Sequence, residues 1–471
     1  MFFRQIYDTS LAQAAYLIGC QRTGEAVVID PERDIERYVE LATREGLKIV
    51  GVAETHIHAD FLSGAREFAE HHDVMLFLSD EGDSDWKYGW LHSREGAGGS
   101  YRHTLLHDGD FFHIGNIRFD VRHTPGHTPE HISFLVTDEG GGATEPMGIL
   151  SGDFVFVGDV GRPDLLEVAA GIAEQKEPSA RRLFESSVNF LDLPDYVQVW
   201  PAHGAGSACG KALGAVPQST VGYERRFNPA LQLTSERDRF LGYVLEGQPE
   251  PPLYFARMKL QNRDGVPLLS GEPLPDKPMA SSSLSAEKLA SVTVLDTRPW
   301  EEFKVAHLRG SLFAPLGSAF VSLAGSYVTP EEEILLVVSN FTHFQEAVVA
   351  LRRIGLDKVG GFILASDMKG CSSELLAKTQ EVQPDAFLAA RAENGLFVLD
   401  VRSEAEFREG ALEGAVNVPH LLLPKFIGEL PSEQDIFVHC RSGVRSSYSC
   451  ALLEKKGLHP VNIIGGYEAL K

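Results

Sequence analysis

The residues that decide the fold are Thr55-His56-Ile57-His58-Ala59-Asp60-Phe61-Leu62-Ser63-Gly64, which come just after the apolar stretch Lys48–Ala53. The apolar stretch predicts a buried strand, so two histidines and an aspartate stand where a strand ends. A side chain in that position is held by a packed scaffold and faces an open edge of the sheet. The segment therefore predicts a ligand-bearing loop in a sheet-rich α/β domain.

Three later segments repeat this arrangement. Thr124-Pro125-Gly126-His127, Ser151-Gly152-Asp153 and Pro201-Ala202-His203-Gly204 each follow an apolar stretch. Imidazoles and carboxylates that converge at one sheet edge make a site for a borderline divalent metal ion. One such histidine alone is typical of a surface loop, but the four segments in this order predict a metal centre.

Further strands and one helix are expected around this centre. Ala26–Asp30, Ile132–Val136 and Val197–Trp200 predict strands, and Ala65–His72 predicts a helix. Phe111–Val121 alternates in polarity around Gly115-Asn116, which predicts a hairpin.

The order H-x-H-x-D, P-G-H, G-D and P-x-H-G resembles the metallo-β-lactamase superfamily over about residues 1–240. The resemblance implies the αββα sandwich of that superfamily. Its hydrolases carry H-x-H-x-D-H, in which the last histidine helps to bind a second metal, whereas this chain has Phe61 there. A phenyl ring binds no metal, so a hydrolytic two-metal centre is not expected. Thioester hydrolysis of the glyoxalase II kind is the alternative.

The sequence most resembles the persulfide dioxygenase branch of this superfamily. The matching runs are residues 55–64, 160–164 and 201–211. The resemblance implies one Fe(II) per chain, bound by His56, His127 and Asp153. Two imidazoles and one carboxylate on one face leave positions open for O₂ and a substrate sulfur.

Other residues of these runs are then expected near the metal. His58, Asp60 and His203 would orient the ligands or bind waters, with plain structural hydrogen bonding as the alternative. Arg162 is a candidate for holding an anionic part of the substrate, unless it forms a salt bridge within its turn. Cys209 is a candidate persulfide acceptor with Lys211 favouring its thiolate form, unless it is simply packed.

The rest of the chain contains an internal repeat. Val294-Leu295-Asp296-Thr297-Arg298 is matched by Val398-Leu399-Asp400-Val401-Arg402, and each leads to a short apolar strand and a helical stretch. Strands that alternate with helices predict two small α/β domains with parallel sheets. Residues 264–286 are rich in proline and serine, which predicts a linker. We therefore expect domains at residues 1–262, 288–372 and 380–471, with a linker at 263–287.

The second copy carries Cys440-Arg441-Ser442-Gly443-Val444-Arg445-Ser446 between a strand and a helix. An anion is favoured in this loop by its inward N–H groups, by the helix N-terminus and by Arg441 and Arg445. The anion is either the Cys440 thiolate or a bound sulfur oxyanion. The loop resembles that of rhodanese sulfurtransferases over residues 380–471, which implies that Cys440 is the nucleophile. In the first copy Asn340 stands opposite Cys440, so that copy is expected to be inactive.

Composition limits the partners. The chain of 471 residues has 43 Lys plus Arg against 66 Asp plus Glu, a net charge of −23, which disfavours nucleic acid. It has no apolar run of about 18 residues and no secretory signal, so neither a membrane span nor secretion is expected. Five cysteines are too few for a disulfide framework and fit a reducing cytoplasm.

The whole sequence thus predicts a fusion enzyme of sulfide detoxification. Its dioxygenase turns a low-molecular-weight thiol persulfide, O₂ and water into thiol and sulfite. Its rhodanese forms or consumes thiosulfate through Cys440. A thioester hydrolase with a sulfurtransferase tail and a non-oxidising sulfur carrier are the alternatives. The sequence leaves open the identity of the thiol, the net direction of the rhodanese step and whether the chain forms a homo-oligomer.

Overall fold

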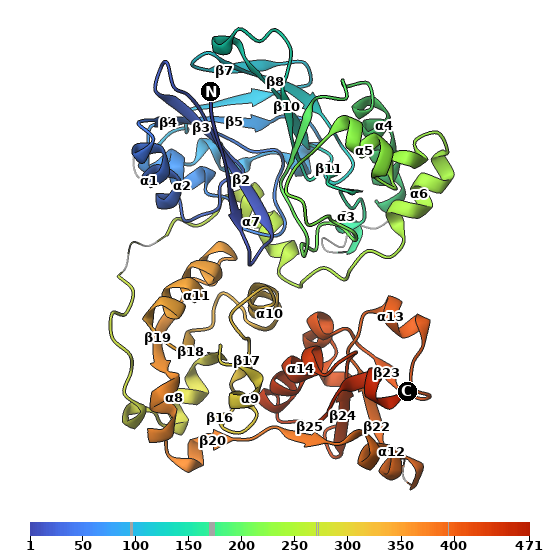
Figure 1. Ribbon diagram of the computed structural model, residues 1–471. Helices are drawn as coiled ribbons and strands as arrows, with labels where there is room; N and C mark the ends of the chain where they lie inside the picture. Colours follow the sequence, from blue (N-terminus) through green and yellow to red (C-terminus); the bar gives the residue numbers. More distant parts are fainter. Residues whose placement is uncertain (95–97, 169–174, 270, 272, 394) are drawn as a thin grey trace. The chain divides into compact units, whose positions relative to one another are not determined.

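The computed structural model describes residues 1–94, 98–168, 175–269, 271, 273–393 and 395–471. The chain divides into two compact units, Met1–Ser270 and Gly271–Lys471 (Figure 1). The predicted fold class, a metallo-β-lactamase-like sandwich followed by α/β domains with parallel sheets, is confirmed. No helix in the described ranges combines the length and apolarity needed to cross a membrane.

The first unit is built on two sheets packed face to face. Apolar side chains from both sheets, among them Tyr16, Phe119 and Phe134, meet in the layer between them. In spatial order the first sheet contains β1 (Phe2–Asp8), β2 (Gln13–Cys20), β3 (Glu25–Ile29), β4 (Lys48–Ala53), β5 (Met75–Ser79) and β6 (His103–Leu106). The second contains β14 (Ser219–Thr220), β13 (Gln198–Pro201), β10 (Gly148–Gly152), β9 (Ile132–Asp138), β8 (Ile117–His123) and β7 (Phe111–Ile114).

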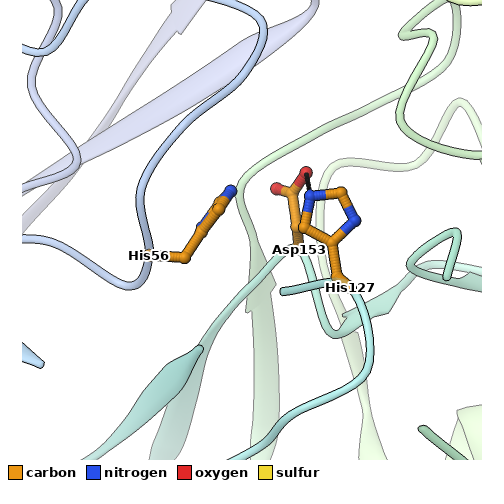
Figure 2. A group of neighbouring side chains, drawn as sticks. All are labelled: His56, His127 and Asp153. Atoms are coloured by element: carbon orange, nitrogen blue, oxygen red, sulfur yellow. Dashed lines mark ion pairs between the residues drawn. The ribbon is translucent and has the colours of Figure 1, made fainter. Parts of the chain in front are cut away.

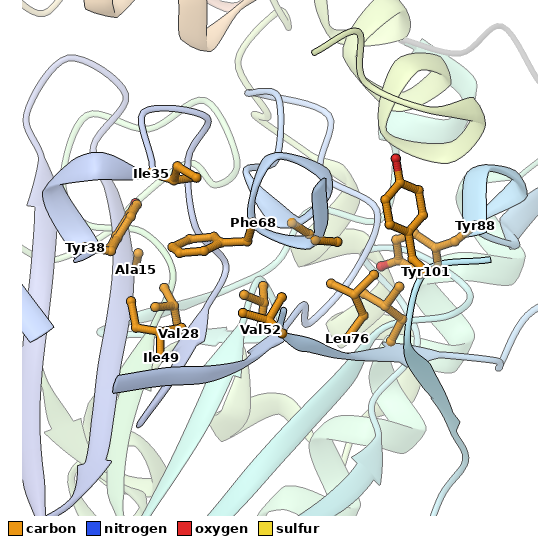
Figure 3. Close-up of a cluster of buried hydrophobic side chains, with 14 of the residues drawn as sticks. Ala15, Val28, Ile35, Tyr38, Ile49, Val52, Phe68, Leu76, Tyr88 and Tyr101 are labelled. Carbon is orange, nitrogen blue, oxygen red and sulfur yellow. The ribbon is translucent and has the colours of Figure 1, made fainter. Parts of the chain in front are cut away.

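Helices cover the outer faces of both sheets. On the first sheet, Tyr38 and Phe68 from two helices pack on Val28, Val52 and their neighbours (Figure 3). Burying each such side chain contributes roughly 1.5–3 kcal/mol. The helices of this unit are α1 (Glu36–Arg44), α2 (Ala65–His71), α3 (Leu165–Val168), α4 (Lys176–Phe190), α5 (Val221–Phe227), α6 (Arg237–Leu245) and α7 (Phe255–Asp264), beside a small hairpin of β11 (Val155–Phe156) and β12 (Asp159–Val160).

The first residues of the predicted linker lie on the first unit. The carbonyl of Val266 accepts a hydrogen bond of 2.7 Å from Arg66 Nη1, and the N–H of Leu269 donates to Glu67 over 2.6 Å. These bonds attach the chain to the first unit beyond residue 262, the predicted end of the domain. Residues 270 and 272 of the predicted linker lie outside the described residues.

The second unit contains the predicted repeat. Its first sheet has the order β17-β15-β18-β19 and its second the order β21-β25-β24-β22-β23, with every strand pair parallel. The two orders match when β15 is aligned with β22. The strands are β15 (Thr293–Asp296), β16 (His307–Leu308), β17 (Leu312–Phe313), β18 (Ile334–Val338), β19 (Val359–Leu364), β20 (Leu376–Ala377), β21 (Gln380–Val382), β22 (Phe397–Asp400), β23 (Val416–Asn417), β24 (Asp435–His439) and β25 (His459–Ile463). The helices are α8 (Ala286–Ser291), α9 (Trp300–Phe303), α10 (Phe320–Tyr327), α11 (Phe341–Arg353), α12 (Pro384–Glu393), α13 (Glu404–Glu409) and α14 (Val444–Lys455).

The matching sequence motifs of the repeat make the same contacts. Arg298 Nη2 lies 2.6 Å from Asp296 and donates to the carbonyl of Ala306, and Arg402 makes the same pair with Asp400. In each copy the buried ion pair ties the end of a central strand to the following loop. The shared motif therefore stabilises the fold of both copies rather than marking a reactive site.

Candidate functional site

Four strand ends bring the predicted metal-binding side chains together. His56 follows β4, His127 follows β8, Asp153 follows β10 and His203 follows β13. Three of these strands run in the same direction. β10 is parallel to β13, and both β8 and β10 are antiparallel to β9. Their carboxyl ends therefore meet at one edge of the second sheet, and the loop after β4 joins them there.

His56, His127 and Asp153 form one compact, buried group (Figure 2). Each offers a ligand atom, and these atoms lie within 4.8 Å of one another. Nε2 of His56 and both carboxylate oxygens of Asp153 make no hydrogen bond to any described residue. Buried polar atoms without hydrogen bonds are costly, so this donor set fits a divalent cation. The ligand roles of the three residues stay a prediction.

Hydrogen bonds fix which nitrogen of each imidazole faces the group. His127 Nδ1 lies 3.1 Å from the carbonyl of Arg162, and His56 Nδ1 lies 3.0 Å from Thr55 Oγ1. Thr55 Oγ1 donates its own hydrogen to Asp30 over 2.9 Å, so its lone pair faces His56. Both Nε2 atoms are left to bind a metal. Burial lowers the pKa of both imidazoles, and neutral imidazole is the form that binds metals.

His131, which the sequence reasoning missed, holds Asp153 in place. Its Nε2 accepts the Asp153 N–H over 3.0 Å, and its ring stacks on that of His56 at 5.1 Å. Gly152 has φ +52°, and a Cβ there would lie 2.6 Å from His131 Nε2, so this turn requires glycine. The available clue was a second histidine four residues after the P-G-H motif.

Asp60, His203 and Cys209 form a second buried group, again with ligand atoms within 4.8 Å of one another. His203 Nε2 lies 3.2 Å from Asp60 and 3.4 Å from Asp153. Burial opposes a charge on His203, but the carboxylates of Asp153 and Asp60 raise its pKa well above the ordinary value. The structure thus places these predicted neighbours of the metal directly beside the first group.

Phe61 and His58 fill the interior next to the ligands. Phe61 is fully buried, and its ring lies 4.4 Å from that of His58. Burial lowers the pKa of His58, but its pair with Asp30 at 3.2 Å prevails and raises the pKa to about 9. His58 therefore makes a structural ion pair in this arrangement.

Arg162 forms the salt bridge that was the alternative to substrate binding. Its Nε and Nη2 donate to the two oxygens of Asp164 over 2.7 and 2.8 Å. Its Nη1 donates to the carbonyls of Ala208 and Pro249. These contacts within the protein favour the salt-bridge alternative for this buried guanidinium, and substrate binding by Arg162 stays a prediction.

Cys209 is a packed thiol in this structure. It is 2% exposed, and burial raises the pKa of its thiol to about 12. Lys211 Nζ is engaged elsewhere, by the carbonyls of Tyr243 and Glu246. Lys211 therefore does not support a Cys209 thiolate in this arrangement, contrary to what the sequence predicts. The cation that acts on the Cys209 thiol is His203.

The Cys440 loop lies between β24 and α14, where the sequence predicts it. The N–H of Gly443 donates to Cys440 Sγ over 3.2 Å, and Ser446 Oγ lies 3.7 Å from the same sulfur. Gly443 has φ +98°, which turns its N–H toward the sulfur just before the helix begins. A helix N-terminus with inward N–H groups favours a negatively charged sulfur.

Both arginines of this loop are paired with carboxylates. Arg445 makes two hydrogen bonds to Glu406, of 2.5 and 2.8 Å, and Arg441 donates to Glu468 over 2.7 Å. The bonds from Arg445 lower the pKa of Glu406 to about 2. Glu406 is thus a positioning residue for Arg445 that the sequence reasoning missed.

The first repeat has a helix cap where the second has its loop. Asn340 Oδ1 accepts the N–H of His343 over 2.9 Å, and α11 begins at the next residue. Only two residues separate β18 from α11, whereas the Cys440 loop needs the four residues between β24 and α14. That the first repeat is inactive stays a prediction.

Known proteins are similar to both parts of the chain. The profile of the Metallo-beta-lactamase superfamily matches residues 8–203, and that of the Rhodanese-like domain matches residues 383–471. The mitochondrial persulfide dioxygenase of Bos taurus is 25% identical over 240 residues, 50% of this chain and 78% of that protein. Hydroxyacylglutathione hydrolase GloC of Haemophilus influenzae is 26% identical over 216 residues, 45% of this chain and 89% of that protein.

One solved structure resembles more of the chain. A metallo-β-lactamase from Staphylococcus aureus, known from a crystal structure, is 42% identical with a TM-score of 0.67. The similarity covers 77% of this chain and 99% of the staphylococcal chain. It therefore extends beyond the first unit.

Proposed function

This chain belongs to the metallo-β-lactamase superfamily and carries a C-terminal rhodanese-like domain, and we propose that it is a persulfide dioxygenase coupled to a rhodanese sulfurtransferase. The first site oxidises the outer sulfur of a low-molecular-weight thiol persulfide, with O₂ and water, to thiol and sulfite. The second site carries sulfane sulfur on Cys440.

The observation that carries the proposal is Phe61 beside the intact group of His56, His127 and Asp153. Two imidazoles and one carboxylate are the ligands of mononuclear Fe(II) in oxygenases. His56, His127 and Asp153 would hold one such Fe(II) per chain, and the bound metal would supply the O₂ chemistry for oxidation of a substrate sulfur. The similarity to a persulfide dioxygenase supports this reading.

The residues of the chain prepare this site in separate ways. Burial keeps the imidazoles of His56 and His127 neutral, and their Nδ1 hydrogen bonds hold the rings in one orientation. His131 fixes the backbone of Asp153. Phe61 fills the space next to His58 with an apolar ring, which excludes water from that side.

The second site performs a thiol–sulfane exchange. The Cys440 thiolate attacks the outer sulfur of thiosulfate, the S–S bond breaks, and sulfite leaves with the electron pair while Cys440 keeps the sulfane sulfur. The reverse step consumes the sulfite that the first site produces and yields thiosulfate. Fusion of the two sites in one chain raises the effective concentration of that sulfite at Cys440.

Thioester hydrolysis is the second candidate function. The group of Asp60, His203 and Cys209 offers donors for a second metal ion, although Phe61 offers none. The similarity to a hydroxyacylglutathione hydrolase points the same way. Asp60, His203 and Cys209 would hold that second metal ion, which would supply Lewis-acid chemistry for thioester hydrolysis.

One set of measurements separates the two candidates. The metal content of the full chain is measured in the protein as purified. Its O₂ uptake with glutathione persulfide and its hydrolysis of a glutathione thioester are then measured in forms loaded anaerobically with Fe(II) or with Zn(II). We expect one iron per chain and one O₂ consumed per sulfite formed. Two zinc ions per chain with thioester turnover, and no O₂ uptake by the iron-loaded form, would refute the dioxygenase proposal.

We also propose that the protein works in the cytoplasm. Its five cysteines form no disulfide within the described part of the chain, and a reducing compartment keeps Cys440 available. Fractionation of cells that produce the tagged protein tests this, and recovery in a secreted fraction would contradict it.

A further inference from the structure

The two repeats of the second unit line an open cavity of about 400 Å³ beside the Cys440 loop. One wall comes from α9 and the chain after β17, and the other from the Cys440 loop and the end of β25. The loop residues Ser442, Gly443 and Val444 line it, and the N–H of Gly443 donates to Cys440 Sγ. A molecule in this cavity therefore touches the loop that holds the reactive sulfur. Its volume lies in the usual range of small-molecule sites, roughly 300–1,000 Å³.

A row of aromatic rings lines this cavity. The ring of Trp300, from the first repeat, lies 5.2 Å from that of Phe313, and Phe313 lies 5.5 Å from Tyr448 on α14. Val444 adds an apolar side chain that is 55% exposed at the start of the same helix. Apolar surface exposed next to a catalytic loop is unfavourable in water, and the apolar part of a ligand would cover it.

The charged groups of the cavity leave it with a net negative charge. Lys304 Nζ lies 2.7 Å from Glu301 and 3.0 Å from Glu381. Glu381 is also held by hydrogen bonds from Trp300 and Asn462. The carboxylate of Glu301, in contrast, is 76% exposed. Two carboxylates and one ammonium favour a ligand with a positive group and disfavour a polyanion.

We propose that this cavity binds the organic part of a low-molecular-weight thiol that bears an ammonium group, so that the first repeat selects the thiol partner of Cys440. The inference rests on the proposed sulfurtransferase function. The Cys440 thiolate attacks the outer sulfur of the persulfide RSSH, the S–S bond of the carrier breaks, and the carrier leaves as RS⁻. The outer sulfur stays on Cys440 with its proton. Trp300 stacks on the apolar part of R, and Glu301 receives its ammonium group.

Kinetics with the full chain test the selection. Cys440 is loaded from thiosulfate, and 2-aminoethanethiol or 3-mercaptopropionate, similar in size and opposite in charge, accepts the sulfur. We expect Trp300→Ala to raise the KM for 2-aminoethanethiol at least tenfold and to leave the KM for thiosulfate within twofold. In the wild type the KM for 2-aminoethanethiol should be lower than the KM for 3-mercaptopropionate. We expect Glu301→Gln to reduce the ratio of these two KM values at least fivefold. The proposal would be overturned if the KM for thiosulfate changed as much as the KM for the thiols. It would also be overturned if the KM values for the thiols were unchanged in both variants.

Two variants serve as matched controls. Val305→Ala removes an exposed apolar side chain close to Trp300 in sequence but outside the cavity, and we expect unchanged kinetics. Trp300→Phe keeps an aromatic ring and should retain most of the thiol selectivity. It also keeps the test decisive if Trp300→Ala does not fold.

A binding measurement separates this inference from the proposed function. Trp300 is the only tryptophan after residue 270. The tryptophan fluorescence of the wild type that is missing from Trp300→Phe therefore comes from the cavity. 2-(Methylthio)ethylamine, the S-methyl form of 2-aminoethanethiol, has an ammonium group, a blocked sulfur and no carboxylate. Saturable quenching by it that disappears in Trp300→Phe supports the cavity even where sulfur transfer fails. Absence of saturable quenching in the wild type would overturn the cavity proposal while leaving the proposed function intact.

Discussion

The backbone N–H of Asp153 donates to Nε2 of His131 over 3.0 Å, so a predicted metal ligand is held by a ring that is not itself a ligand. The other nitrogen of His131 lies 2.8 Å from Thr124 Oγ1, which lies 2.9 Å from Ser133 Oγ. Burial lowers the pKa of His131 well below its ordinary value, so the ring is neutral and Nε2 is free to accept. A hydrogen-bonded chain thus runs from Ser133 on β9 through Thr124 and His131 to the backbone N–H of Asp153.

Replacing His131 by Leu should weaken metal binding. The substitution leaves the buried N–H of Asp153 without an acceptor, which costs about 1–3 kcal/mol. Loss of such a supporting partner lowers metal affinity roughly 10–100-fold. Competition titration of the metal-free protein with zinc measures this directly. His131→Gln, whose amide oxygen can accept the same bond, is the control and should retain most of the affinity; equal losses in both variants would contradict this account.

Replacing Asp153 by Ala should remove the metal and persulfide-dependent O₂ uptake together. Only two imidazoles of the predicted ligand set remain, too few to hold Fe(II) tightly. Elemental analysis gives iron per chain, and an oxygen electrode gives the uptake rate. Transfer of sulfur from thiosulfate to cyanide, the reaction proposed for Cys440, is the internal control and should be unchanged. Wild-type iron content in Asp153→Ala would show that Asp153 is not a ligand.

His420 should make the second unit sensitive to acid. Burial, followed by the charge of Arg445, lowers the pKa of His420 to about 4. Between pH 6.5 and 4 the unfolded chain therefore binds a proton that the folded protein does not. The stability contribution is present above pH 6.5 and is lost as the pH falls through this window, by up to about 3 kcal/mol.

Hydrogen exchange of the β24 amides at several pH values measures this effect. In His420→Gln, which has no titrating ring, protection should fall less between pH 6.5 and 4.5 than in the wild type. Parallel pH profiles for the two proteins would contradict the assignment to His420.

The parts of the fold that were predictable depend on local sequence. The predicted strand Lys48–Ala53 is β4, and the hairpin around Gly115-Asn116 joins β7 to β8. The predicted helix at 65–72 is α2, one residue shorter. These elements are set by alternation, apolar runs and turn residues that lie close together in the chain.

The missed features depend on tertiary pairing. Glu406 is 39 residues from Arg445, and Trp300 meets the Cys440 loop only because the two repeats pack together. Arg162 binds the carbonyl of Pro249, 87 residues away, which the motif around it does not indicate. The sequence offers candidate side chains at strand ends, but which of them bind substrate and which bind the protein depends on these distant partners.

Replacing Asn340 by Ala should leave both activities within twofold of the wild type. Asn340 caps α11, so the loss of its bond to His343 should lower stability by roughly 1 kcal/mol. Thermal unfolding measures the stability, and O₂ uptake and thiocyanate formation measure the activities. A large loss of sulfur transfer at unchanged stability would mean that the first repeat has a reactive site of its own.

Replacing Cys440 by Ser should remove sulfur transfer and leave O₂ uptake. A hydroxyl at this position is barely ionised and cannot carry sulfane sulfur, although Gly443 and Ser446 still offer their hydrogen bonds. His56, His127 and Asp153 are untouched, so persulfide should still consume O₂.

The products of Cys440→Ser decide whether the two sites are separate. Sulfite, thiosulfate and O₂ are measured in one reaction with glutathione persulfide, and the product should shift from thiosulfate to sulfite. Loss of O₂ uptake would mean that the persulfide reaches the metal through Cys440, and the two-site model would be wrong. Enzymatic thiosulfate at the normal rate would mean that another thiol transfers the sulfur. Cys209 would then be the first suspect, because it lies beside His203 in the group next to the predicted metal ligands.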